Sequence, residues 1–302
     1  MAFLHNDKEQ FADAINLASY QTGVMTQAVE KDYYVSLILR KLAQRIPFIV
    51  FKGGTSLSKC HGVIKRFSED IDITIDAEIT QGQKRRVKSA IEEIAAELGM
   101  VVTNLEDTHS RRDYNRYVIA YPSVLPTAST AVQPAVLLET SFKTISFPTV
   151  VLPVRSYIGS MMESEAPELL ESLELDPFNM KVQGLDRTLA DKIFAVCDYY
   201  MQNNVQKHSR HLYDIHMLLP LVPLNEHFME LMQNVRTDRK PSPVCVSAQD
   251  GVNMPSILFQ IISSNAYRSD YNNLTTQLLE EPIPYEKVID SLRLVAEQLT
   301  LD

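Results

Sequence analysis

The sequence predicts an α+β fold, in which a mixed sheet with flanking helices is followed by a mainly helical C-terminal region. Two amphipathic stretches occupy the first 45 residues, and short apolar runs separated by glycine and proline fill residues 46–157. Helical spacing then returns and continues to the end of the chain. At 302 residues the chain can bury a large core in one or two domains.

The N-terminal half is predicted to alternate helices and strands. Residues 7–20 and 26–45 have helical apolar spacing, and residues 46–51 form an apolar run typical of a buried strand. Residues 80–99 predict a charged amphipathic helix that ends at glycine. Four further strands, separated by proline-containing loops, are expected at residues 100–105, 114–121, 135–142 and 150–157.

Helical spacing dominates after residue 163. It predicts helices at residues 165–173, 187–203, 209–219, 225–235, 256–264 and 286–299. Residues 236–255 contain three prolines and many polar residues, which indicates an extended or mobile loop. We therefore expect an α/β core with N-terminal helices at residues 1–160 and a mainly helical domain at residues 161–302.

Composition and cysteine spacing favour an ordinary globular protein of the cytoplasm without a membrane partner. Apolar residues make up 45% of the chain and charged residues 22%. No apolar run approaches the ~20 residues needed to cross a bilayer, and the N-terminus lacks the pattern of a signal peptide. Three scattered cysteines argue against a disulfide framework, and neither they nor the seven histidines have the spacing of zinc ligands.

The net charge of −9 means that a nucleic-acid ligand would need a local basic patch. Each basic stretch can also be an ordinary solvated face. The candidates are Lys84-Arg85-Arg86 with Lys88, Arg111-Arg112 with Arg116, and Lys207-His208 with Arg210-His211.

A glycine turn follows the first predicted strand. Gly53 and Gly54 break the strand after Lys52, and Thr55 and Ser56 begin a short predicted helix. Glycine lets the backbone approach a ligand closely, and the free N–H groups of a helix start bind anions. This turn therefore predicts a phosphate site.

Carboxylates alternate with isoleucines from Asp70 to Asp76. Residues two apart in a strand point to the same face, so Asp70 and Asp72 project together while isoleucines pack behind them. Two close carboxylates repel each other unless a cation joins them, and Mg²⁺ shared with substrate phosphates is the simplest such cation. An edge strand with a solvated acidic face is the alternative. We expect Asp76, further along, to be solvent-exposed.

These motifs resemble those of a known enzyme family. Lys52-Gly53-Gly54-Thr55-x-Leu57 followed by Arg66-Phe67-Ser68-Glu69-Asp70-Ile71-Asp72 is similar to the signature of AbiEii/AbiGii nucleotidyltransferases. These are toxins of AbiE-like and MenT-like (type IV) toxin–antitoxin systems in the DNA polymerase beta-like superfamily. A second block, Leu185–Lys192 and Arg210–Ile215, also resembles the family, with Asp191 where Glu is usual. The resemblance spans residues 25–220.

Glu139 is a candidate third carboxylate. It lies in a predicted strand of mostly apolar and small residues, where a charge is costly unless it is paired or binds a cation. The resemblance implies that such a residue can complete the metal site. The alternative is a pair with Arg155 or Lys143.

The second block supplies further candidates. Lys192 flanks the apolar stripe of its helix, so its stem can follow the core while its ammonium neutralises triphosphate charge. Asp214 is a candidate pocket residue, and the alternative is an ion pair with Arg210, four residues earlier on the same helix. Arg187 is a nucleotide-binding or structural candidate, and a surface ion pair with Asp191 would account for it equally.

Together these residues predict a Mg²⁺-dependent nucleotidyltransferase. Asp70, Asp72 and Glu139 would hold metal ions, and the glycine turn would bind the nucleoside triphosphate. Arg66 and Ser68 would support the metal strand, and the helical domain would complete the active-site cleft. The resemblance implies an RNA acceptor, with tRNA as the leading choice, growth arrest and an antitoxin. The alternatives are a kinase-like phosphotransferase acting on a protein hydroxyl and a non-catalytic nucleotide-binding regulator.

Overall fold

The chain folds into two compact units. The structure, a computed structural model, describes residues 3–126 and 133–299. Unit 1 comprises Met1–His61, Ser68–Ile145 and Thr149–Val182, and unit 2 comprises Gly62–Phe67, Ser146–Pro148 and Gln183–Asp302. Residues 149–182 thus all lie in unit 1, whereas the domain boundary expected from the sequence falls at residue 160.

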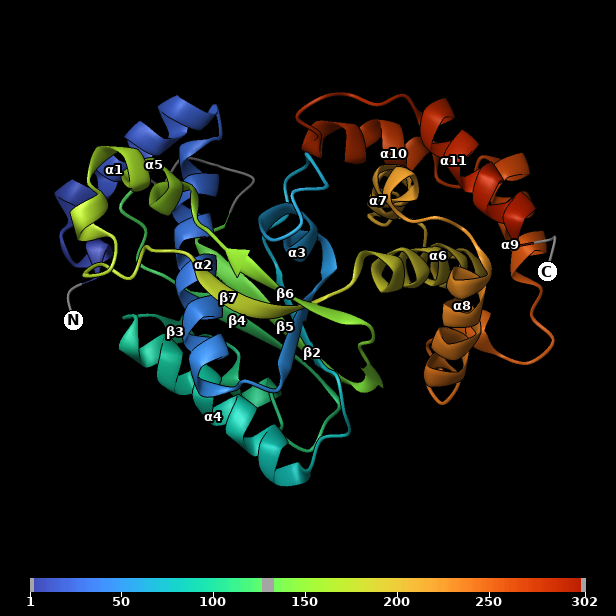
Figure 1. Cartoon of the computed structure of the whole chain (residues 1–302), viewed down its shortest axis with the longest axis horizontal. Helices are drawn as coiled ribbons and strands as arrows, with labels where there is room; N and C mark the ends of the chain where they lie inside the picture. Colours follow the sequence, from blue (N-terminus) through green and yellow to red (C-terminus); the bar gives the residue numbers. More distant parts are fainter. Residues whose placement is uncertain (1–2, 127–132, 300–302) are drawn as a thin grey trace. The chain divides into compact units, whose positions relative to one another are not determined.

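Unit 1 is built on a seven-stranded mixed sheet with the order β3-β4-β5-β2-β1-β7-β6 (Figure 1). Strand β1 is antiparallel to β2 and parallel to β7, β2 is parallel to β5, and β4 is antiparallel to both β3 and β5. This arrangement confirms the predicted α+β class. The strands are β1 (Ile49–Lys52), β2 (Ile71–Ile75), β3 (Val101–Val102), β4 (Tyr114–Ala120), β5 (Ala135–Ile145), β6 (Thr149–Val154) and β7 (Phe178–Gln183).

One face of this sheet carries the core of unit 1. Buried residues alternate along β4 and β5, and Tyr117, Ile119 and Leu138 belong to the same apolar cluster as the inner faces of α2 and α4. Positions between them are less buried, so the polar residues of these strands lie on the opposite face. The helices are α1 (Lys8–Thr22), α2 (Thr26–Arg45), α3 (Gly53–Lys59), α4 (Gln81–Glu97) and α5 (Tyr157–Glu165), with 3-10 turns η1 (Leu4–Asn6), η2 (Leu105–Asp107) and η3 (Pro167–Leu169).

Three sequence expectations for unit 1 were wrong in detail. The helix predicted at 165–173 lies instead at α5, because Ser156 caps the N–H of Gly159 (2.9 Å) and Ile158 is buried. The strand predicted at 100–105 is only two residues long, since η2 begins at residue 105. Strand β7 was not predicted from the sequence, although buried and less buried residues alternate along part of it.

Unit 2 is helical, as the sequence predicted. Helix α7 packs against both α6 and α11, and α9 packs against α11 (Figure 1). None of the described helices is long and apolar enough to cross a membrane. The helices are α6 (Leu185–Met201), α7 (Arg210–Leu218), α8 (Glu226–Arg239), α9 (Met254–Ser264), α10 (Arg268–Asn273) and α11 (Tyr285–Gln298), with 3-10 turns η4 (Leu219–Leu221), η5 (Val246–Ala248) and η6 (Thr275–Leu278).

Two connecting segments are held firmly within unit 2. The loop predicted at 236–255 is shorter, because α8 continues to Arg239 and α9 begins at Met254. Its Ser247 donates from both N and Oγ to Asp198 (2.7 Å each), so the loop is anchored rather than simply extended. The segment Gly62–Phe67 pairs with the chain after α10, as Phe67 N donates to the carbonyl of Leu278 (2.9 Å).

Candidate active site

The glycine turn and the Asp72 carboxylate are in direct contact. Gly53 follows β1 with φ of +79°, a backbone conformation that favours glycine. A Cβ atom at Gly53 would lie 2.0 Å from Asp72 Oδ2. Any side chain here would displace the carboxylate, so glycine is required both by the backbone and by the close approach of Asp72.

The hydroxyl groups of the turn stabilise its shape. Ser56 Oγ donates to the carbonyl of Gly53 (2.9 Å), and Thr55 Oγ1 lies 2.9 Å from Ser68 Oγ. Both Thr55 and Ser56 are buried. Ser68 is therefore fixed two residues before Asp70, which agrees with its expected support of this segment. Gly54, also buried, continues α3.

A row of charged residues crosses four neighbouring strands on the open face of the sheet. The register places Lys52 of β1 beside Asp72 of β2, Asp72 beside Glu139 of β5, and Glu139 beside Arg116 of β4. Paired residues on adjacent strands point to the same face. Lys52, Asp72 and Glu139 are partly buried, and Arg116 is exposed. The row thus brings two carboxylates together between two cations.

Asp70 has an oxygen atom that lacks a partner. Its Oδ1 atom is buried and has no hydrogen bond within the described part of the chain. A buried carboxylate oxygen without a donor is costly, and a cation would relieve that cost. Asp76, by contrast, pairs with Lys181 and is partly buried, so the expectation of a solvent-exposed Asp76 was wrong.

Within the charged row, Glu139 lies close to Arg116 of β4. Its Oε1 lies 3.7 Å from Arg116 Nε, while Arg155 pairs with Glu163 instead. Within residues 3–126 and 133–299, no three His, Cys, Asp or Glu side chains are gathered closely enough to hold a metal ion. The metal group of Asp70, Asp72 and Glu139 thus stays a prediction, and the Asp70 Oδ1 atom is the one that a cation would satisfy.

Sequence reasoning missed Tyr114, the first residue of β4. Tyr114 is 52% exposed and lies on the same face of the strand as Arg116. Burial of the hydroxyl end raises the pKa of Tyr114 to about 12, and the Glu139 and Asp72 carboxylates contribute to the increase. An aromatic residue two positions before an exposed arginine in a predicted strand was the available signal.

A second charged cluster lies in unit 2 around Asp214. Arg66 donates from Nε and Nη2 to its two oxygens (2.7 and 2.9 Å), and Lys192 Nζ lies 2.9 Å from Oδ2. The Asp214 side chain is fully buried, and its salt bridges hold its pKa far below the usual range despite desolvation. The alternative pair of Asp214 with Arg210 is not formed, since both oxygens face other cations.

Two cations and a histidine lie around the Asp214 carboxylate in this cluster. Arg66 and Lys192 share the single carboxylate of Asp214, and the remaining neighbour of Lys192 is Nδ1 of His211 at 3.5 Å. Desolvation, followed by the nearby Lys192 ammonium, lowers the pKa of His211 well below its usual value. His211 is thus held in its neutral form.

The Arg187 side chain is enclosed by contacts within the protein. It is 1% exposed, and its guanidinium lies near Asp191 (3.3 Å), Asp238 (3.1 Å) and the Phe147 ring (4.7 Å). The expected ion pair between Arg187 and Asp191 does form. It does not lie on the surface as expected, because Arg187 is buried and the pair belongs to a larger network. Asp191 also accepts from Gln183 Nε2 (3.1 Å).

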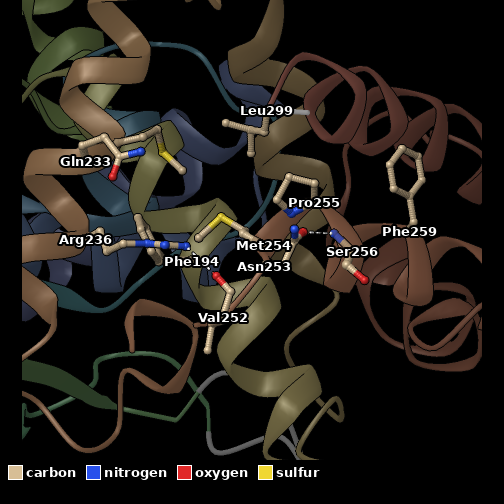
Figure 2. A pocket seen from close by; sticks show the side chains of 11 residues that line it. Phe194, Gln233, Arg236, Val252, Asn253, Met254, Pro255, Ser256, Phe259 and Leu299 are labelled. Carbon is tan, nitrogen blue, oxygen red and sulfur yellow. Dashed lines mark hydrogen bonds between the residues drawn. The ribbon is translucent and has the colours of Figure 1, made fainter. Parts of the chain in front are cut away.

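Unit 2 also contains a cavity of about 600 Å³ that none of the predicted site residues lines. In Figure 2 the Arg236 side chain extends towards Val252, whose carbonyl oxygen accepts its hydrogen bond (3.2 Å). The lining is otherwise mostly apolar, with contributions from Phe194, Met232, Met254, Pro255, Phe259 and Leu299.

Comparisons with known proteins agree with this geometry. No curated protein sequence matches the chain. Its fold is similar to that of the nucleotidyltransferase toxin MenT4 (Rv2826c) from Mycobacterium tuberculosis H37Rv, with a TM-score of 0.58 and 16% identity over 95% of this chain and 89% of that one. Residues 37–291 match the sequence model of the family described as "Nucleotidyl transferase AbiEii toxin, Type IV TA system". The chain therefore belongs to the AbiEii family of nucleotidyltransferase toxins, whose members are part of type IV toxin–antitoxin systems.

Proposed function

We propose that this nucleotidyltransferase uses Mg²⁺ to transfer a nucleoside monophosphate from a nucleoside triphosphate to RNA, with tRNA as the first candidate acceptor. Family membership supplies the enzyme class, a triphosphate substrate and an antitoxin partner. Growth arrest would follow from modification of the RNA. The observation that carries the proposal is the Asp72 carboxylate held against Gly53. The buried Asp70 Oδ1 atom, which has no hydrogen bond among the described residues, adds support.

Asp70 and Asp72 are the residues that would hold the metal. Their oxygens are hard ligands of the kind that Mg²⁺ prefers, and Asp70 Oδ1 has no competing hydrogen bond among the described residues. A bound Mg²⁺ would neutralise negative charge on the phosphates during the displacement. The backbone at Gly53 and Gly54 would bind the triphosphate, since the hydroxyl of Thr55 already contacts Ser68 and that of Ser56 donates to Gly53.

The proposed reaction is an in-line displacement at the α-phosphorus. The oxygen of an RNA hydroxyl forms a bond to this phosphorus, the bond to the bridging oxygen of the β-phosphate breaks, and pyrophosphate leaves. The proton of the hydroxyl passes to solvent. Catalysis of this kind depends mainly on positioning and electrostatics. The residues of unit 1 would supply the positioning through the rigid sheet register around Asp72.

We assign the unit 2 candidates different roles. The Lys192 ammonium, held 2.9 Å from Asp214, is the cation that we assign to an anionic group such as the leaving pyrophosphate. Asp214 would orient Lys192, and Arg66 would hold Asp214 rather than the nucleotide. Arg187, which is enclosed by two aspartates and Phe147, would only stabilise the fold.

Incubation of total cellular RNA with the purified protein, Mg²⁺ and each α-³²P-labelled triphosphate tests the proposal. We expect RNA labelling by the wild type with at least one triphosphate and none by Asp72→Ala. Equal labelling by both proteins would refute the role of Asp72.

The rival functions give different results in the same assay. Transfer from a γ-³²P-labelled triphosphate to protein, without RNA labelling, would establish the kinase-like alternative. Nucleotide binding without transfer of either label to RNA or protein would identify a non-catalytic regulator. The membership of the chain in a nucleotidyltransferase family favours neither result.

A further inference from the structure

The three basic stretches of the sequence differ in what their side chains contact. On α4, Lys84 pairs with Asp113, and Lys88 donates to the carbonyl of Thr108 (2.7 Å). In the stretch 207–211, the rings of His208 and His211 stack with that of Tyr199. These side chains are largely engaged within the fold. The stretch from Arg111 to Arg116 is different because it leads directly to the charged row.

Strand β4 presents an aromatic ring and a guanidinium on one face. Tyr114 and Arg116 are both exposed, whereas Asn115 between them is buried. Their side chains are about half exposed (52% each). The register places Arg116 beside Glu139, which is itself beside Asp72. The exposed pair is thus one strand away from the nearer carboxylate and two strands away from Asp72.

The turn before β4 is held in a fixed conformation. Asn115 accepts from the N–H of His109 (2.8 Å) and donates to its carbonyl (3.0 Å). Arg112 donates from Nη1 to the carbonyl of Asp107 (2.9 Å). These bonds close a loop that carries Arg111 and Arg112, both exposed. A guanidinium on an ordered loop loses less conformational entropy when it binds a phosphate.

Charge in this segment is locally positive, although the whole chain has a net charge of −9. Asp113 is neutralised by Lys84. In the described part of the chain, Arg111 and Arg112 have no ion pair with a carboxylate. An acidic protein that binds a polyanion must concentrate its cations, and the segment that carries Arg111 and Arg112 leads to Arg116, which pairs in register with Glu139.

We propose that Tyr114, Arg116, Arg111 and Arg112, hereafter the β4 surface, bind the single-stranded end of the RNA acceptor. This inference rests on the proposed transfer to RNA. The Tyr114 ring stacks on a base, and the guanidiniums contact the phosphates of the strand. Aromatic stacking combined with cations is the common means of binding single-stranded RNA. Duplex bases are already stacked, so the exposed ring favours an unpaired end.

In this arrangement Glu139 is a positioning residue. Its carboxylate lies near Arg116 Nε and interacts with the Tyr114 hydroxyl, so it fixes both side chains at the edge of the charged row. An acceptor strand held there places its terminal hydroxyl towards Asp72. Glu139 thereby acts through the acceptor rather than through a metal.

Fluorescence anisotropy with a short fluorescein-labelled single-stranded RNA tests the β4 surface. We expect Tyr114→Ala to weaken RNA binding about 10-fold through loss of stacking, and Tyr114→Phe to restore most of it because the ring remains. Arg116→Ala is expected to weaken RNA binding to a similar degree. It should also reduce the dependence of RNA affinity on salt concentration by the amount expected for about one lost phosphate contact. Binding of a fluorescent triphosphate analogue should not change in any of these variants.

Matched controls come from the same unit. Tyr20 is 88% exposed on α1, and Arg155 is 49% exposed and paired with Glu163, so Tyr20→Ala and Arg155→Ala reproduce the chemical changes elsewhere. Wild-type RNA affinity in Tyr114→Ala and Arg116→Ala would overturn the inference, as would equal affinity for a blunt RNA duplex. Loss of antitoxin binding with RNA affinity intact would overturn it too.

The inference and the proposed function fail in different ways. If the wild type labels RNA but the β4 variants keep its affinity and its KM for RNA, the inference is wrong and the function stands. If the variants weaken RNA binding as expected but the wild type transfers no nucleotide, the β4 surface stands and the function is wrong.

Discussion

Asp70 and Asp72 in unit 1 differ from Asp214 in unit 2 in how far their carboxylate oxygens are engaged by the protein. Both oxygens of Asp214 are engaged by Arg66 and Lys192, and its side chain is fully buried. Asp70 and Asp72 are only partly buried, and Asp70 Oδ1 has no hydrogen bond within the described residues. A carboxylate with its charge fully matched maintains the fold, whereas one with an unmatched buried oxygen retains capacity for a ligand.

The largest expected effect is loss of transfer in Asp72→Asn. The substitution keeps the shape of the side chain but removes a negative charge beside Gly53. We expect activity to fall on the order of 10³-fold because charge stabilisation at the transferring phosphoryl group is lost. Initial rates of RNA labelling measure this effect.

Asp76→Asn is the matched control for that experiment. Asp76 lies on the same alternation but pairs with Lys181 at a site about one-third exposed. Its substitution should leave transfer unchanged and alter stability by less than about 1 kcal/mol. Equal loss of activity in the two variants would mean that transfer depends on the total negative charge of the strand and not on Asp72 in particular.

Asp214→Asn should instead reduce stability. It removes the buried carboxylate that both the Arg66 guanidinium and the Lys192 ammonium contact, and breaking such a buried pair typically costs about 3–5 kcal/mol. Urea unfolding followed by circular dichroism measures the loss. A wild-type midpoint would show that the cluster contributes little to stability and that the contrast between the two regions is false.

Gly53→Ala combines both kinds of effect. The added Cβ meets Asp72 Oδ2 at 2.0 Å, and the positive φ is unfavourable for alanine. We expect a loss of about 1–3 kcal/mol in stability together with reduced triphosphate binding. Gly62→Ala is a suitable control, since its φ is also positive but no atom lies within 4 Å of the added Cβ. If both variants bind nucleotide normally, the close contact with Asp72 has no functional role.

A smaller effect is expected from pH. Desolvation and the neighbouring Lys192 lower the pKa of His211, with Arg66 and Arg210 acting in the same sense and Asp214 opposing them. The unfolded chain therefore binds a proton below about pH 6.5 that the folded chain resists, so stability is complete above that pH and decreases on acidification, by at most about 1.4 kcal/mol per unit.

Unfolding free energies at pH 7 and 5 test this sign. His211→Asn should reduce the decrease, whereas substitution of the exposed His227 should not. The lowered pKa of Asp214 adds a later loss, which begins only as the pH falls below about 3.8. Stability that rises between pH 7 and pH 5 would contradict the account of unit 2.

Sequence predicted the features that depend on local periodicity. The mixed α/β opening, the helical C-terminal region and the Gly53 turn were all encoded in neighbouring residues. Strand β2 likewise follows from the alternation of isoleucines, although it begins at Ile71 and leaves Asp70 just before it.

What sequence did not predict depends on distant residues. Arg66 and Asp214 are 148 positions apart, and no local pattern pairs them. The partner of Glu139 was mistaken because β4 lies beside β5, which placed Arg116 rather than Arg155 next to it. Tyr114 was not singled out because its proposed role depends on its neighbours on adjacent strands, which the sequence does not place beside it.

Calorimetric titration with non-hydrolysable triphosphate analogues tests the central claim most directly, since it separates the nucleotide and metal site from any acceptor. Wild-type protein and Asp76→Asn should bind an analogue in Mg²⁺ with similar affinity, while Asp72→Asn and samples with excess EDTA should bind at least about 10-fold more weakly. Binding that is equal in Asp72→Asn and the wild type, or unchanged by removal of Mg²⁺, would contradict the claim.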